Sequence, residues 1–126
     1  MNITIKKYRE VYLLILEGEL DLYHSHEMEK LFQKLCDRGA TRFVIDFSGI
    51  RYIDSSGVGT LIKLKNMGTR RGLSLMFSGI TGEAYNVLNL ANLLDFFPRE
   101  TDFREALKKL SARDTSGSGK GETGEN

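Results

Sequence analysis

The residues best suited to chemistry lie together in the middle of the chain: Asp54, Ser55, Ser56 and Gly57. An apolar run at 43–47 precedes them and apolar residues at helical spacing follow, which predicts a strand that turns into a helix here. The first N–H groups of a helix have no partner within it, so Asp and Ser side chains can cap them. The same N–H groups favour an anion, and a hydroxyl at this position could carry a phosphate. A simple helix cap and a functional loop are both consistent with this pattern.

Enzymatic readings of the same serines find little support. Nucleophilic catalysis needs a base and an orienting acid beside the nucleophile, whereas the sequence lacks G-x-S-x-G. Its two histidines, His24 and His26, fall in a different predicted helix from Ser56. Gly57 and Gly59 resemble part of a glycine-rich loop, but the P-loop and the full G-x-G-x-x-G pattern are absent. We therefore predict neither catalytic residues nor a nucleotide-hydrolysing enzyme, while loose nucleotide binding stays open.

A metal site is a second chemistry that the sequence allows in principle. His and carboxylate side chains suit zinc, and four such residues lie close together: Asp21, His24, His26 and Glu27. Two histidines that are two positions apart do not share a helical face. We expect a solvated helix start here, with no metal and no cofactor.

Composition narrows the class of protein further. The chain of 126 residues fits one domain, and its net charge of +1 provides no strong field for nucleic acid or an anionic membrane. The single cysteine, Cys36, cannot form an internal disulfide and is expected to pack in a helix. With no signal peptide before the first strand and no apolar run that could span a bilayer, a cytoplasmic protein is expected.

Hydrophobic periodicity predicts alternating strands and helices along the chain. Predicted strands are 3–6, 11–16, 41–47, 73–77 and an edge strand at 94–97, with 48–53 as a connector. Predicted helices open at His24 or Ser25, run over 56–71 and 83–92, and follow a cap at Thr101. This alternation implies parallel pairing and an α/β fold. The Ser/Gly-rich segment 113–126 is predicted to be a disordered tail after a domain of residues 1–112.

Several stretches, taken in order, resemble a known family. They are Gly18-Glu19-Leu20-Asp21, the segment 44–50 leading to Asp54-Ser55-Ser56-Gly57, the segment 75–79 and the segment 90–97. Their order and spacing, over about residues 3–110, resemble the STAS domain of bacterial anti-sigma factor antagonists, the SpoIIAA/RsbV-like group. The resemblance implies a single α/β domain with a mixed, largely parallel sheet of four or five strands packed against about four helices.

The resemblance also implies a switch. In that family the unphosphorylated antagonist binds an anti-sigma factor that is also a serine kinase, which releases the sigma factor. Phosphorylation of the second serine, here Ser56, abolishes binding, and a PP2C-type phosphatase restores it. The protein is then a kinase substrate and not an enzyme. The alternative is a STAS scaffold or ligand-sensing module in another bacterial signalling complex, and the oligomeric state stays open.

The resemblance supplies a set of expected partner-binding residues: Asp21, Asp54, Ser55, Ser56 and Gly57. It implies that Asp54 orients the loop, that Ser55 shapes the kinase contact and that Gly57 leaves room for it. Asp21 belongs to a second loop at the same end of the sheet. For that residue, a turn-forming acid at a strand end is an equally open interpretation.

Overall fold

The structure, a computed structural model, describes residues 1–115, with side chains described up to residue 111. Five strands form one sheet in the order β1-β2-β3-β4-β5. The strands are β1 (Asn2–Tyr8), β2 (Val11–Leu20), β3 (Arg42–Ile53), β4 (Ser74–Ser78) and β5 (Arg99–Glu100). The first pair is an antiparallel hairpin and the other neighbours are parallel. The predicted mixed, largely parallel sheet is therefore confirmed.

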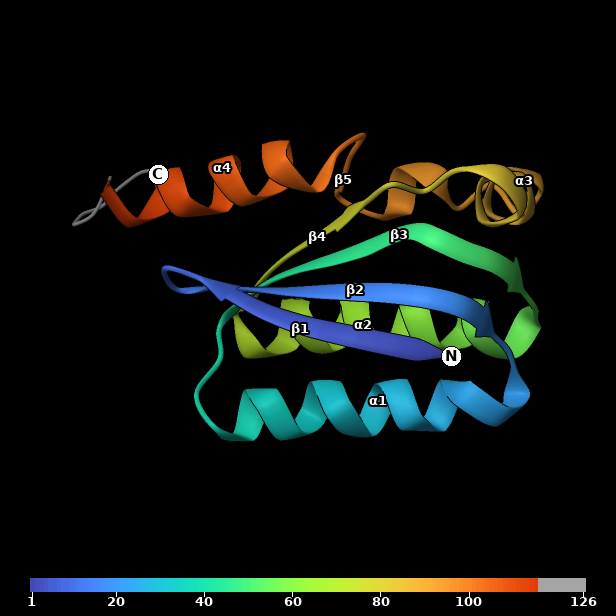
Figure 1. The fold of residues 1–126 in the computed structure, drawn as a ribbon, viewed down its shortest axis with the longest axis horizontal. Coiled ribbons are helices and arrows are strands. Elements are labelled where there is room, and N and C mark those ends of the chain that lie inside the picture. Colours follow the sequence, from blue (N-terminus) through green and yellow to red (C-terminus); the bar gives the residue numbers. More distant parts are fainter. Residues whose placement is uncertain (116–126) are drawn as a thin grey trace.

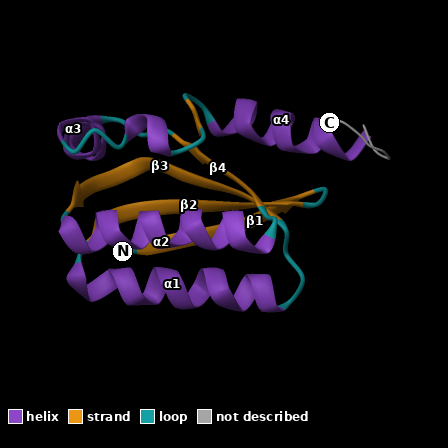
Figure 2. Ribbon diagram, turned by 180° about the vertical axis from the view of Figure 1, so that it is seen from behind, coloured by secondary structure: helices purple, strands orange, loops and turns teal. Residues whose placement is uncertain are grey.

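Four α-helices cover this sheet (Figures 1 and 2). They are α1 (Leu22–Asp37), α2 (Ser55–Arg71), α3 (Gly82–Leu90) and α4 (Phe103–Thr115). Helices α1 and α2 lie side by side on one face, and α4 lies on the opposite face. Buried residues of α1, α2 and α3 belong to one large apolar core, whereas Ala106 and Leu110 of α4 form a smaller one.

Strand β3 is longer than the sequence predicted, because it continues through the expected connector 48–53. Its pairing with β2 shifts register twice, between Ile15 and Glu17 and between Gly18 and Glu19. Such β-bulges let a strand bend and still continue. Gly49 permits the bend, since a Cβ there would lie 2.9 Å from the Leu16 carbonyl oxygen. The extension brings the end of β3 level with the end of β2.

The start of α1 also differs from the prediction. The helix begins at Leu22 and its N-cap is Asp21, not His24 or Ser25. Apolar periodicity locates the buried face of a helix and leaves its first turn undefined. The carboxylate of Asp21 is the stronger cap here because it accepts hydrogen bonds from two backbone N–H groups of the first turn.

Two further corrections concern the segment before α4. Residues 94–96 form a 3₁₀ turn, and the edge strand is the short β5 that follows Pro98. The capping side chain at α4 is Asp102, whose Oδ1 accepts from the Arg104 N–H at 2.7 Å. Thr101 instead ties the sheet together, since its carbonyl accepts from the Gly79 N–H at 3.2 Å.

The boundary between the domain and the predicted tail stays a prediction. Helix α4 extends to Thr115, and residues 116–126 lie outside the described residues. Within residues 1–115, no helix is long and apolar enough to cross a membrane.

Candidate functional site

The two strands at the centre of the sheet end side by side, and each feeds directly into a helix. The last residues of β2 and β3, Leu20 and Ile53, are paired in the parallel ladder. Asp21 and Asp54 follow them, and both adopt the extended conformation of a helix N-cap. The starts of α1 and α2 are therefore neighbours at one edge of the sheet (Figure 1). The structure thus brings together all five predicted site residues, which lie in these two helix starts.

Asp54 binds to both helix starts. Its Oδ1 accepts the Gly57 N–H of its own helix at 3.0 Å, and its Oδ2 accepts the Leu22 N–H of α1 at 3.3 Å. Its backbone N–H lies 3.4 Å from the Leu20 carbonyl oxygen. The carboxylate therefore caps α2 and fixes the position of α1 at the same time.

Asp21 serves α1 alone. Its Oδ1 accepts from the Tyr23 and His24 N–H groups, each at 3.1 Å, and lies 2.7 Å from His24 Nδ1. Partial desolvation raises the pKa of Asp21, but the hydrogen bonds from His24 and Tyr23 and the charge of His24 outweigh it. The pKa of this carboxyl is therefore held below its ordinary value.

Gly57 permits the close approach of α2 to the sheet. It is buried, and a Cβ at this position would lie 2.3 Å from the Leu20 carbonyl oxygen and 2.7 Å from Ile53 Cγ1. Any larger residue would push α2 away from the ends of β2 and β3. The glycine therefore has a packing role within the domain that the sequence alone did not reveal.

The two serines occupy the first positions of α2. Ser55 is exposed, and Ser56 is partly buried. Ser56 lines a cleft of about 340 Å³ between the two helices, together with Leu22, Ser25, His26, Glu29, Gly59, Thr60 and Lys63. Within the described part of the chain, the backbone N–H groups of both serines have no acceptor. These N–H groups are free to receive an anion at the positive end of the helix dipole.

Polar groups line the cleft one turn further along the helices. Thr60 Oγ1 donates to Glu29 Oε2 at 3.0 Å, and Lys63 Nζ lies 3.5 Å from the same oxygen. These contacts join α1 to α2. The cation of Lys63 is already paired with Glu29, so the N–H groups of α2 are the anion-attracting groups nearest to Ser56.

Sequence reasoning missed three large side chains near these helix starts. Leu22 and Tyr23 open α1 and are 67% and 85% exposed, and Tyr52 lies near the end of β3 with 45% exposed. Exposed apolar groups that gather at one edge are typical of protein interaction sites. The signal in the sequence was Leu22 and Tyr23 themselves, because they fall outside the apolar periodicity of α1.

A comparison with protein families identifies this fold. The family model of the STAS domain matches residues 2–109. The chain belongs to the STAS domain family. The resemblance drawn from the sequence is therefore confirmed, and so is the predicted α/β fold of a STAS domain.

Solved structures of other STAS proteins are similar to this one. A candidate anti-sigma factor antagonist from Thermotoga maritima has a TM-score of 0.78 and 20% identity, over 85% of this chain and 92% of that one. RsbS from Moorella thermoacetica has a TM-score of 0.76 and 21% identity, over 91% and 99%. The phosphorylated form of the Bacillus protein SpoIIAA has a TM-score of 0.67 and 20% identity, over 86% and 99%. At these identities the likeness concerns the fold.

Proposed function

We propose that this STAS protein is an anti-sigma factor antagonist and that phosphorylation of Ser56 controls its binding to a partner. The unphosphorylated form binds an anti-sigma factor with serine kinase activity and so releases the sigma factor. A PP2C-type phosphatase removes the phosphate. The protein is a substrate and a binding partner in this scheme, not an enzyme, and it acts in the cytoplasm. The observation that carries the proposal is a hydroxyl at the open N-terminus of α2, beside exposed apolar side chains.

The domain can accept a phosphate on Ser56 without refolding. The phosphate adds a charge of about −1.5 to −2. The unpartnered N–H groups of Ser55 and Ser56 and the dipole of α2 compensate part of that charge. Asp54 remains bound to Gly57 and Leu22, so the cap does not depend on either serine hydroxyl. Two solved forms of SpoIIAA, unphosphorylated and phosphorylated, are consistent with a fold that tolerates such a change.

The same phosphate would disrupt a protein interface. Leu22 and Tyr23 provide apolar surface beside the cleft that Ser56 lines. A partner that covers this surface must remove the phosphate from water, and the carboxylates of Asp21 and Asp54 stand at the same edge. Desolvation and like charges together weaken such a contact by several kcal/mol.

Each of the five expected residues receives a role in this proposal. Ser56 carries the phosphate, and Ser55 lies at the surface that the kinase approaches. Asp54 and Asp21 fix the two helix starts, and Gly57 holds α2 close enough to the sheet for both serines to face the partner. Leu22 and Tyr23 add the apolar anchors that the sequence did not indicate.

The proposal is tested by incubating the protein with ATP, Mg²⁺ and the candidate anti-sigma kinases of the same genome, followed by mass spectrometry. We expect one added phosphate on the wild type and on Ser55→Ala, mapped to Ser56, and none on Ser56→Ala. Binding to the same kinase should be strong before modification and weak afterwards. A wild type that active kinases neither modify nor bind would overturn the proposal.

A further inference from the structure

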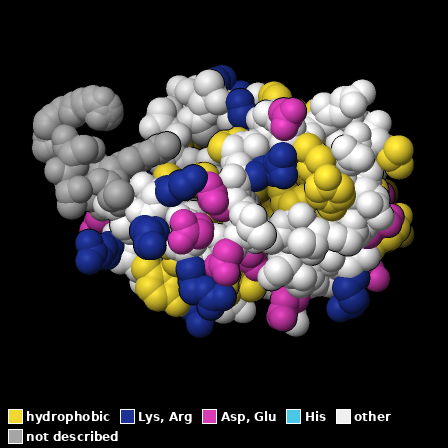
Figure 3. All heavy atoms as spheres, turned by 90° about the horizontal axis from the view of Figure 1, so that it is seen from above, with side chains coloured by type: hydrophobic (Ala, Val, Ile, Leu, Met, Phe, Trp, Pro, Cys, Tyr) yellow, Lys and Arg dark blue, Asp and Glu magenta, His cyan; other side chains and the backbone are white. Residues whose placement is uncertain are grey.

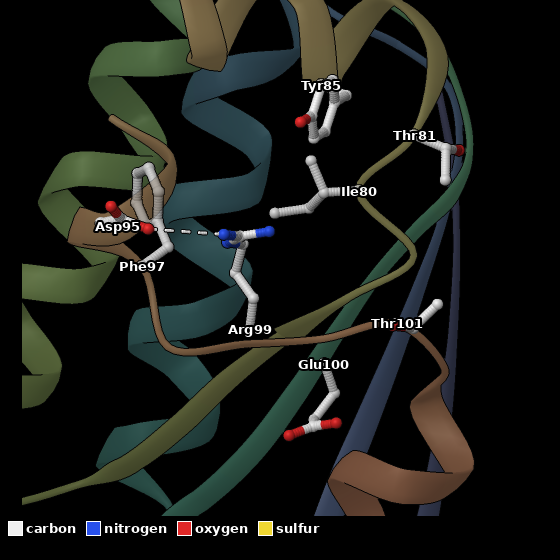
Figure 4. Close-up of a pocket in the computed structure, with 8 residues that line it drawn as sticks. All are labelled: Ile80, Thr81, Tyr85, Asp95, Phe97, Arg99, Glu100 and Thr101. Atoms are coloured by element: carbon white, nitrogen blue, oxygen red, sulfur yellow. Dashed lines mark ion pairs between the residues drawn. The ribbon is translucent and has the colours of Figure 1, made fainter. Parts of the chain in front are cut away.

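A second cleft lies away from the starts of α1 and α2, beside β4, α3 and β5. It has a volume of about 440 Å³ and is lined by Ile80, Thr81, Tyr85, Asp95, Phe97, Arg99, Glu100 and Thr101 (Figure 4). On the face that carries α3 and α4, a patch of hydrophobic side chains has basic and acidic side chains next to it (Figure 3). The volume falls in the range of small-molecule sites.

Arg99 is the one cationic residue among those that line this cleft. Its Nε donates to the Leu94 carbonyl oxygen at 2.9 Å, which fixes the guanidinium, and its side chain is 35% exposed. The guanidinium points into the space below Ile80 and Tyr85 (Figure 4). A guanidinium held in this way presents its remaining N–H groups to a planar anion.

The acidic residues of the cleft leave this cation available. Asp95 lies 3.6 Å from Arg99, but its side chain is fully exposed, so the ion pair is weak and readily exchanged. The carboxylate of Glu100 points away from Arg99 (Figure 4) and is paired with Lys109. An incoming anion therefore competes only with Asp95.

The opposite side of the cleft is apolar. Ile80 and Phe97 are largely buried side chains that line it, and the hydroxyl of Tyr85 stands above them. The ring of Phe97 is fixed by edge-on contacts with Phe77 at 5.0 Å and Phe96 at 5.1 Å between centroids. The cleft thus has a rigid apolar wall facing one immobilised cation.

We propose that this cleft binds a small amphiphilic anion, with a carboxylate or a phosphate monoester on a compact apolar body. The anionic group replaces Asp95 at Arg99, and the apolar body packs against Ile80 and Phe97. The hydroxyl of Tyr85 supplies a further hydrogen bond. The site is separate from Ser56, so it stands whether or not the phosphorylation switch exists.

The test uses benzoate and phenyl phosphate as probes and benzyl alcohol as the uncharged control. Amide chemical shifts of the ¹⁵N-labelled protein are followed by NMR during titration. We expect saturable shifts at Ile80, Tyr85 and Arg99 with a dissociation constant in the millimolar range, as suits about ten heavy atoms. Benzyl alcohol should bind at least about tenfold more weakly, because it lacks the charge. The stronger of the two anions identifies the head group.

Three variants locate the anion. Arg99→Gln should weaken binding at least about tenfold, whereas the matched control Arg51→Gln, at an exposed arginine of β3, should leave it unchanged. Asp95→Asn should tighten binding about twofold to threefold, because the competing carboxylate is gone. The Asp95 variant keeps the test decisive if Arg99→Gln unfolds. Absence of saturable shifts, equal binding by Arg99→Gln, or unchanged or weaker binding by Asp95→Asn would overturn the proposal.

Discussion

Helices α1 and α2 begin with the same framework and present different surfaces. Both follow a parallel strand, both have an aspartate N-cap in the extended conformation, and the two caps stand at one edge of the sheet. The first two helical residues are Leu22 and Tyr23 in α1 but Ser55 and Ser56 in α2. One start is therefore apolar and exposed, and the other is polar and open to modification.

The comparison extends to the third helical position, where α1 has His24 and α2 has Gly57. His24 folds back onto the cap, with Nδ1 at 2.7 Å from Asp21. Gly57 has no side chain and lets α2 approach the Leu20 carbonyl oxygen. The α1 cap is thus stabilised by a side chain, and the α2 start by close backbone packing. A cap that leaves two N–H groups free suits an anion, whereas one occupied by its own histidine does not.

The largest expected effect comes from filling the space at Gly57. Gly57→Ala would place a Cβ at 2.3 Å from the Leu20 carbonyl oxygen, so we expect a loss of roughly 3 kcal/mol in the free energy of unfolding. The matched control is Gly59→Ala in the same helix, where a Cβ meets nothing within 4 Å. It should stabilise the protein by about 0.5–1 kcal/mol, because alanine favours the helix more than glycine does.

Urea denaturation of the two alanine variants checks this contrast. Opposite signs for the two changes would show that the requirement for glycine is specific to the position next to Leu20. Equal effects would contradict the close packing of α2 against the end of β2.

Apolar periodicity and turn residues were sufficient to predict the α/β class and most helices. They could not predict the second half of β3, because the bulges at Gly18 and Gly49 depend on contacts between two strands. The Asp54-Ser55-Ser56 loop was recognisable because polar caps before a helix have a local signature. The bond from Leu22 to Asp54 was not, since it joins residues that are distant in the chain.

The second prediction concerns the apolar start of α1 and requires the kinase partner identified by phosphorylation. Tyr23→Ala should weaken binding to that partner by at least about tenfold, because exposed aromatic residues at interfaces often act as anchors. Leu90→Ala is the control, since Leu90 is equally exposed at 85% but lies in α3. Both variants should unfold like the wild type. Isothermal calorimetry that shows the same loss for both would sever α1 from the binding surface.

The third prediction separates the two caps. Asp54→Ala removes the bonds to Gly57 and Leu22, so it should destabilise the protein by about 1–2 kcal/mol and loosen both helix starts. Asp21→Ala should loosen the start of α1 alone. Hydrogen exchange of the first-turn amides measures the difference. Unchanged exchange of the Leu22 amide in Asp54→Ala would contradict the bridge between the helices.

The smallest effect is a pH dependence that belongs to the α1 start. The pKa of Asp21 is held below its ordinary value in the folded protein, so its ionised form favours folding. That contribution is complete above the ordinary pKa and disappears as the pH falls through the lowered one. Urea denaturation of wild type and Asp21→Asn between about pH 2 and pH 6 should therefore show a stability difference that shrinks on acidification. Asparagine keeps an oxygen acceptor for the cap but lacks the charge that attracts protonated His24, so the shrinking part reports the charge. A difference that stays constant down to the lowest pH would mean that hydrogen bonding alone, without the charge, makes the α1 cap.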